Sequence, residues 1–264
     1  MSLGDNIEKR LEGLDRNQLR RFVWLCAVRT LPLLSAERRG FAYWEDDRLR
    51  YLYGVFNAID LAANGTEDFH AENFAVEAAN AAVKVPNTNG STAYFAAKAA
   101  NFAARLIGEA IHAAKRARAV HSRDSRANDN ATRAAGDRVA RAVAATAAAA
   151  VILAAPAYPV ANTTEDKHKE LEKILLNNIE AFRTDNLSAL NNDTGIYGET
   201  WPNFLEDLNA SGCGYWARLY EDLFTNGFVI DKKELERRLN IPDEIKKKGA
   251  AAVGLWLEKD SAKS

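Results

Sequence analysis

Apolar residues recur at helical spacing along most of this chain, and no segment alternates apolar and polar residues as a half-exposed strand would. The clearest pattern follows Asp15, where apolar residues cover most sides of a predicted helix, as expected for a helix at the centre of a bundle. Asp15 and Gln18 have the spacing of a capping box at the start of this helix. Pro32 is expected to end it near Leu31.

The same spacing predicts further helices, separated by turn residues such as Gly65 and Pro86. The sequence therefore predicts a soluble, all-α, multi-helix array. Asp231 and Glu234 have capping-box spacing, and Pro242 suits the first position of the last helix. The predicted helices cover residues 47–64, 66–85, 91–120, 126–155, 165–182, 199–209, 215–224, 232–240 and 243–259.

An alanine-rich run over residues 93–155 has no proline until Pro156, and we expect its two long helices to form an antiparallel hairpin. Alanine lets helix axes approach more closely than the usual ~8–10 Å, but it buries less apolar area than leucine. Residues 156–164 predict a linker. We therefore expect an alanine-rich helical domain over residues 1–158 and a smaller C-terminal helical module over residues 159–264. The module either packs on that domain or hangs from the linker.

The composition predicts a cytoplasmic protein. Hydrophobic residues make up 47% and charged residues 27%, and the net charge of −1 argues against a wholly basic nucleic-acid binder. The first residues contain no apolar signal region, and two distant cysteines, Cys26 and Cys213, do not make a disulfide framework. Residues 142–161 carry no charge, but their alanines and two prolines favour a buried helix over a membrane span.

Basic residues are concentrated in the alanine-rich part of the chain. Residues 91–141 contain ten Lys or Arg and four Asp or Glu. Such a patch would attract a phosphate backbone or an acidic partner. No aromatic residues alternate with these arginines to stack on bases, so we favour a solvated helix face that keeps the hairpin soluble. The candidate binding residues of this patch are Arg116, Arg118, Arg123 and Arg126.

Cys213 is a candidate nucleophile because glycines flank it and a predicted helix begins just after it. A helix N-terminus lowers the pKa of a thiol. No histidine lies near Cys213 in the sequence, and a turn cysteine between two helices is the interpretation that we favour.

Two charged residues, Arg29 and Asp60, lie within strongly apolar predicted helices. A buried charge is costly unless it is paired. We therefore predict that Arg29 and Asp60 meet each other or pair with other buried groups. The alternative is that Arg29 extends to solvent and Asp60 lies at a helix edge.

Aromatic residues gather in the C-terminal part of the sequence. They could line a ligand pocket or anchor an interface, although such a cluster is more often the core of a helical domain. We take Trp201, Trp216 and Tyr220 as candidate binding residues. The whole cluster comprises Trp201, Phe204, Tyr215, Trp216, Tyr220, Phe224 and Trp256.

The sequence contains no motif of a metal or cofactor site. The four histidines show no HxxxH or HExxH spacing, and no phosphate-binding or dinucleotide-binding glycine pattern occurs. We therefore expect no catalytic residues, no metal and no cofactor.

Both ends of the chain resemble a set of uncharacterised bacterial proteins, in which alanine-rich helical regions precede a Trp/Tyr module. The front end also resembles bacterial immunity proteins with alanine-rich bodies. The resemblance covers the two ends and implies no catalytic residues. It suggests a bacterial, cytoplasmic accessory or immunity-type protein. The matching segments are residues 29–34, Trp201, residues 215–216, residues 219–223, Gly227, residues 241–244 and residues 249–253.

The sequence thus leads us to expect a non-enzymatic bacterial protein-binding protein, with immunity or defence as its most specific version. One alternative is a binder of nucleic acid or of an acidic partner through the arginine-rich hairpin. A second alternative is an enzyme that depends on Cys213.

Overall fold

The structure is a computed structural model of the whole chain. It describes residues 7, 9–35, 41, 44, 46–64, 144, 164–184, 190 and 200–261. Of the part that it describes, 84% is helical and none forms a strand, which confirms the all-α prediction. None of the described helices is long and apolar enough to cross a membrane.

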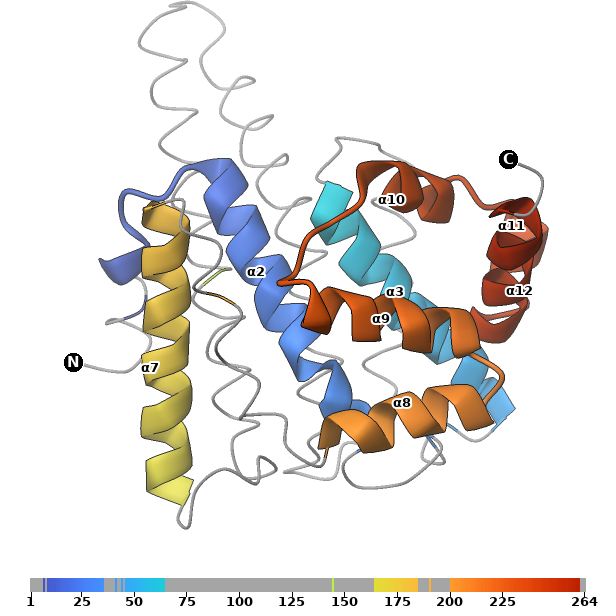
Figure 1. Cartoon of the computed structure of the whole chain (residues 1–264), viewed down its shortest axis with the longest axis horizontal. Coiled ribbons are helices and arrows are strands. Elements are labelled where there is room, and N and C mark those ends of the chain that lie inside the picture. Colours follow the sequence, from blue (N-terminus) through green and yellow to red (C-terminus); the bar gives the residue numbers. More distant parts are fainter. Residues whose placement is uncertain are drawn as a thin grey trace, which may run out of the picture.

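Helix α2 (Arg16–Thr30) runs through the centre of the described part of the molecule (Figure 1). Its capping box forms as predicted: the backbone N–H of Gln18 donates to Asp15, and that of Asp15 donates to the Gln18 side chain, both at 2.8 Å. The nine residues from position 22 to position 30 are all buried. The helix ends before Pro32, where the 3₁₀ helix η1 (Leu31–Ser35) begins.

Two long helices pack against α2 from different sides. Helix α3 (Arg48–Asn64) buries a continuous stretch from Leu52 to Ala62, so it is as central as α2. Helix α7 (Thr164–Arg183) lies alongside α2 (Figure 1). There Phe22 meets Phe182 edge-to-face, with ring centroids 6.5 Å apart. Both helices confirm their predictions to within one residue at each end.

The C-terminal part folds into the short helices α8 (Thr200–Ala210), α9 (Gly214–Thr225), α10 (Lys232–Leu239), α11 (Asp243–Lys246) and α12 (Ala250–Ser261). Of these, α10 and α12 pack on α3, whereas α8 packs on η1 and α9. The single helix predicted over residues 243–259 is wrong, because Gly249 separates α11 from α12 with a positive φ of 87°. A Cβ at this position would lie 2.7 Å from the carbonyl carbon of Leu49 on α3. Only glycine allows this close approach. Pro242 is the N-cap of α11 rather than its first residue.

Only the Asp231 half of the capping box predicted for α10 forms. Asp231 accepts hydrogen bonds from the backbone N–H groups of Lys233 and Glu234, at 2.9 and 3.2 Å. The Glu234 carboxylate does not complete the box. It accepts from the Tyr215 hydroxyl and pairs with Arg237 at 2.9 Å.

The N-terminal and C-terminal helices share one hydrophobic core. The ring of Phe56 on α3 lies 4.7 Å from that of Trp216 and 5.2 Å from that of Tyr220. The C-terminal helices therefore pack on the N-terminal ones, which is one of the two arrangements that we considered. The predicted boundary near residue 158, the helix over 66–85 and the alanine-rich hairpin lie outside the described residues, apart from Ala144, which is helical and buried.

Candidate binding site

A pocket of about 160 Å³ lies between α3, α9, α10 and the loop that joins α9 to α10. A cavity of ~150 Å³ holds one benzene-sized molecule, whereas sites for whole metabolites span ~300–1,000 Å³. The pocket is therefore large enough for one side chain or a group of that size. Its apolar lining comes from Trp24, Ile59, Ala63, Leu219, Leu223, Val229 and Ile230.

A buried ion pair between Asp60 on α3 and Arg238 on α10 also lines the pocket. Nε and Nη2 of Arg238 donate to the two carboxylate oxygens of Asp60, both at 2.9 Å, and the two side chains are only 5% and 6% exposed. This is the bidentate geometry in which a guanidinium group binds a carboxylate. The ion pair fastens α10 to α3 across 178 positions of sequence.

Burial and charge act against each other on this pair. Burial raises the pKa of Asp60 above its usual value, although the nearby Arg238 opposes the shift. Burial also works to lower the pKa of Arg238, but the Asp60 carboxylate outweighs it and holds this pKa above its usual value. The guanidinium therefore stays charged at any physiological pH.

The pocket is also lined by Tyr220, whose buried hydroxyl takes no part in the ion pair. The residue is 1% exposed and lines the pocket, and within the described part of the chain its hydroxyl has no hydrogen-bond partner. Burial, followed by the charge of Asp60, raises its pKa well above the usual value, so it stays protonated beside the ion pair. Buried polar groups usually have a partner, which makes an unpartnered one a place to look for a ligand.

The mouth of the pocket is acidic. Asp222 and Asp231 are exposed there, and Glu234 is half-buried. The lining as a whole carries four carboxylates, those of Asp60, Asp222, Asp231 and Glu234, against one guanidinium. Glu234 is already paired with Arg237, which leaves the two exposed aspartates to set the charge at the mouth.

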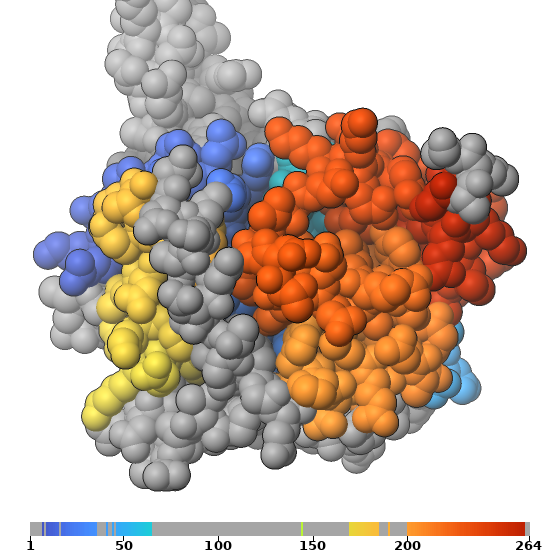
Figure 2. All heavy atoms as spheres, in the orientation of Figure 1, coloured from blue at the N-terminus to red at the C-terminus, as the bar shows by residue number. Residues whose placement is uncertain are grey.

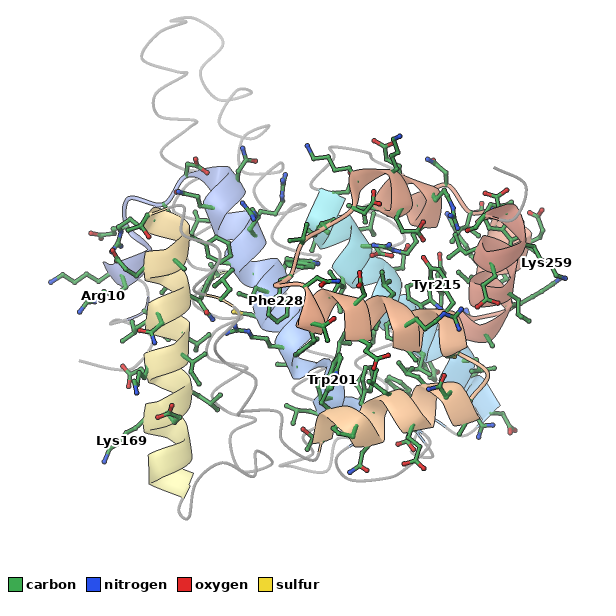
Figure 3. The ribbon with its side chains drawn as sticks, in the orientation of Figure 1. Arg10, Lys169, Trp201, Tyr215, Phe228 and Lys259 are labelled. Carbon is green, nitrogen blue, oxygen red and sulfur yellow. The ribbon has the colours of Figure 1, made fainter. Side chains whose placement is uncertain are left out.

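An exposed apolar side chain stands at the rim. Val229 is 71% exposed, and Leu255 on α12 is the other large hydrophobic residue that is exposed in the part of the chain described here. Residues of α9, the loop after it and α10 form a continuous part of the surface in view in Figure 2. Phe228, next to Val229, turns inward between α9 and α2 and packs edge-to-face on Trp24, which fixes the loop (Figure 3).

The structure brings one of the three aromatic candidates to this pocket. Tyr220 lines it, whereas Trp216 is fully buried and donates its indole N–H to the carbonyl of Ala250 at 2.9 Å. Trp201 is half-buried and packs on Phe224, with ring centroids 3.7 Å apart. The other predicted binding residues, Arg116, Arg118, Arg123 and Arg126, lie outside the described residues.

Cys213 does not have the pKa of a nucleophile. It is the N-cap of α9, yet burial raises the pKa of its thiol to about 12, and the charge of Arg48 opposes this shift without cancelling it. The lowering of the pKa that would have supported a nucleophile is therefore not found, in keeping with the turn cysteine that we favoured. Cys26 has the same raised pKa of about 12 because it is buried in α2, and neither cysteine forms a disulfide.

The prediction for Arg29 and Asp60 is confirmed in its second form: both are buried, and each pairs with another group. They do not pair with each other, because Asp60 pairs with Arg238. Arg29 pairs with other buried groups: its Nη2 donates to the carbonyl of Leu190 at 3.2 Å, and its guanidinium lies 5.3 Å from the ring centroid of Phe228. Asp60 could be singled out from the apolar run around it, whereas Arg238 lies in a polar helix and gives no such signal.

Among the described residues, no group of three or more His, Cys, Asp or Glu side chains could hold a metal ion. Comparisons with protein-family models, curated proteins and solved structures found no match to this chain.

Proposed function

We propose that this chain is a non-enzymatic protein-binding protein, and that its partner docks on the face formed by α9, the following loop and α10. The observation that carries the proposal is the pocket of about 160 Å³ with Val229 standing 71% exposed at its rim. Interface anchors commonly fill a pocket that holds one side chain, and Val229 adds exposed apolar area beside this one.

The chemistry of the lining favours binding over catalysis. A general acid or base needs a pKa near the working pH. Arg238 is held charged by Asp60, and Tyr220 is held protonated by burial. The Cys213 thiol, with its pKa of about 12, is a poor nucleophile at neutral pH. Arg238 and Tyr220 each keep one protonation state, which suits recognition because their charge and hydrogen-bonding roles stay fixed.

The most specific version of the proposal is a bacterial, cytoplasmic immunity or defence protein. Its support is the resemblance of both chain ends to uncharacterised alanine-rich bacterial proteins, and of the front end to bacterial immunity proteins. In this version the partner is a toxin or a phage component, and a toxin-like protein encoded beside this chain should bind it. A dissociation constant weaker than about 100 μM for that protein would remove the support for an immunity role.

The docking face can be tested by comparing two matched variants in co-purification with mass spectrometry. Val229→Asp places a charge at the pocket rim, and Leu255→Asp makes the same kind of change on α12, away from the pocket. Because both side chains are exposed, both variants should fold. We expect a partner to co-purify with the wild type and with Leu255→Asp, and to be lost with Val229→Asp. Equal recovery with both variants, or equal loss, would contradict the proposed face.

A further inference from the structure

We propose that the pocket binds a lysine or arginine side chain of the partner protein, with the Tyr220 hydroxyl oxygen accepting a hydrogen bond from its cationic group. This inference rests on the proposed protein-binding function and names what enters the pocket. Three independent features of the site support it: its shape, its one unpartnered buried oxygen and the sign of its charges.

The shape suits a cation on an apolar stem. The pocket is narrow enough for a single side chain, and its walls include Ile59, Leu219 and Leu223. Lysine and arginine carry three or four methylene groups that gain from such walls, while their charged ends keep polar partners. A short acid or amide side chain would leave these walls uncovered.

Because both carboxylate oxygens of Asp60 accept from Arg238, the Tyr220 hydroxyl oxygen is the buried acceptor that a ligand in the pocket can use. Nε and Nη2 of Arg238 are already directed at both carboxylate oxygens of Asp60. Besides burial, the charges of Asp60 and Arg238 both shift the pKa of the Tyr220 hydroxyl, Asp60 upwards and Arg238 downwards, and all three residues line the pocket. An N–H donor that entered the pocket would therefore satisfy a buried oxygen that has no partner among the described residues.

The charges at the mouth select a cation rather than an anion. Asp222 and Asp231 are exposed at the pocket, so an incoming ammonium or guanidinium group is attracted and a carboxylate or phosphate group is repelled. Arg238 offers no compensation to an anion, because Asp60 neutralises it. Arg237, which precedes Arg238 in α10, is paired with Glu234 at 2.9 Å.

The occupant can be tested by titrating the full chain in NMR experiments with four capped amino acids: N-acetyl-lysine amide, N-acetyl-arginine amide, N-acetyl-norleucine amide and N-acetyl-glutamate amide. Norleucine has a similar apolar stem and no charge. We expect the lysine or arginine compound to bind about tenfold more tightly than the norleucine compound, because a hydrogen bond to a charged group and the acidic mouth both favour it. The glutamate compound should bind most weakly. Equal binding of the lysine, arginine and norleucine compounds would overturn the proposal.

Three variants and one control locate the effect. Tyr220→Phe removes only the hydroxyl and should weaken binding of the cation about fivefold, with no loss for the norleucine compound. Asp222→Asn and Asp231→Asn remove a charge each, and asparagine still caps α10. Both should weaken cation binding and its dependence on salt. Glu236→Gln removes an exposed carboxylate of α10 that does not line the pocket, and it should change nothing. The same loss in Glu236→Gln as in the aspartate variants would contradict a specific site.

The outcomes separate this inference from the proposed function. If no cation binds and Val229→Asp still loses the partner, the docking face stands and the cationic occupant is wrong. A further probe is n-butylammonium, which is the lysine side chain without a backbone. If it binds as tightly as the capped lysine, and Val229→Asp keeps its partner, the pocket is a site for small amines and the proposed protein docking face is wrong. Binding of the capped cation together with loss of the partner in Tyr220→Phe would support both.

Discussion

Replacing Arg238 by methionine is the sharpest perturbation of the pocket, because it removes one charge of a pair whose side chains are 5% and 6% exposed. Methionine keeps much of the apolar stem of arginine. The substitution leaves the Asp60 carboxylate buried without its two donors at 2.9 Å. Breaking a buried ion pair by removing one partner costs ~3–5 kcal/mol. We expect Arg238→Met to lower the free energy of unfolding by about this amount.

The assay is unfolding in guanidinium chloride followed by circular dichroism. With a denaturant dependence of ~2–6 kcal/mol/M, the expected loss shifts the midpoint by on the order of 1 M. Arg218→Met is the matched control. Arg218 pairs with Glu258 at the surface, where the side chains are 65% and 39% exposed. Exposed pairs contribute at most ~1 kcal/mol.

A double-mutant cycle isolates the pair from the loss of packing. Leucine has the branched shape of aspartate, so Asp60→Leu combined with Arg238→Met replaces the pair by apolar groups of similar shape. Such replacements are often neutral. We expect the double variant to be more stable than either single variant, with a coupling of ~2 kcal/mol or more. Additive effects, or equal losses in Arg238→Met and Arg218→Met, would refute a buried ion pair between α3 and α10.

Three further predictions test the fold around the pocket. Gly249→Ala should destabilise the chain by about 1–3 kcal/mol more than Gly13→Ala in thermal or denaturant unfolding. Both glycines have φ near 90°. Only at Gly249 would the new Cβ meet backbone atoms, 2.7 Å from the carbonyl carbon of Leu49. Equal losses would show that this contact is absent. The thiols of Cys26 and Cys213, with their pKa values raised to about 12 by burial, should stay unlabelled by a disulfide reagent at pH 8 until denaturant unfolds the chain. Because these pKa values are raised in the folded state, stability should fall as the pH rises from about 9 towards 12; rapid labelling of the native chain would contradict the burial. Asp15→Ala should cost about 1 kcal/mol through loss of the cap of α2, whereas Asp15→Asn should cost little; similar losses in both would argue against capping.

Signals that lie close together in sequence predicted the long helices of this fold. Asp15, Gln18 and Pro32 set the two ends of α2 through contacts within a few residues, so the sequence alone was sufficient. Gly249 was missed for the opposite reason. A glycine within a periodic run costs a helix only ~1 kcal/mol, and the contact that breaks this helix comes from Leu49, far away in the chain.

The pocket could be predicted only in part. Asp60 could be predicted as a buried charge because it interrupts an apolar run. Its partner Arg238 could not, because it lies in a helix rich in charged residues and only the tertiary structure buries it to 5% exposure. Tyr220 belonged to the predicted aromatic cluster because of its ring. Its role at the pocket depends on its hydroxyl, whose missing partner is a property of the tertiary structure. The acidic mouth likewise requires α9 and the α9–α10 loop to be placed side by side.

A crystal structure of the full chain with N-acetyl-lysine amide tests the pocket most directly. The predicted result is a ligand whose stem lies against Ile59 and Leu223 and whose ammonium nitrogen lies ~2.7–3.1 Å from the hydroxyl oxygen of Tyr220. The Asp60–Arg238 pair should be unchanged beneath it. A pocket that holds only ordered water at saturating ligand, or a ligand bound elsewhere on the chain, would contradict it.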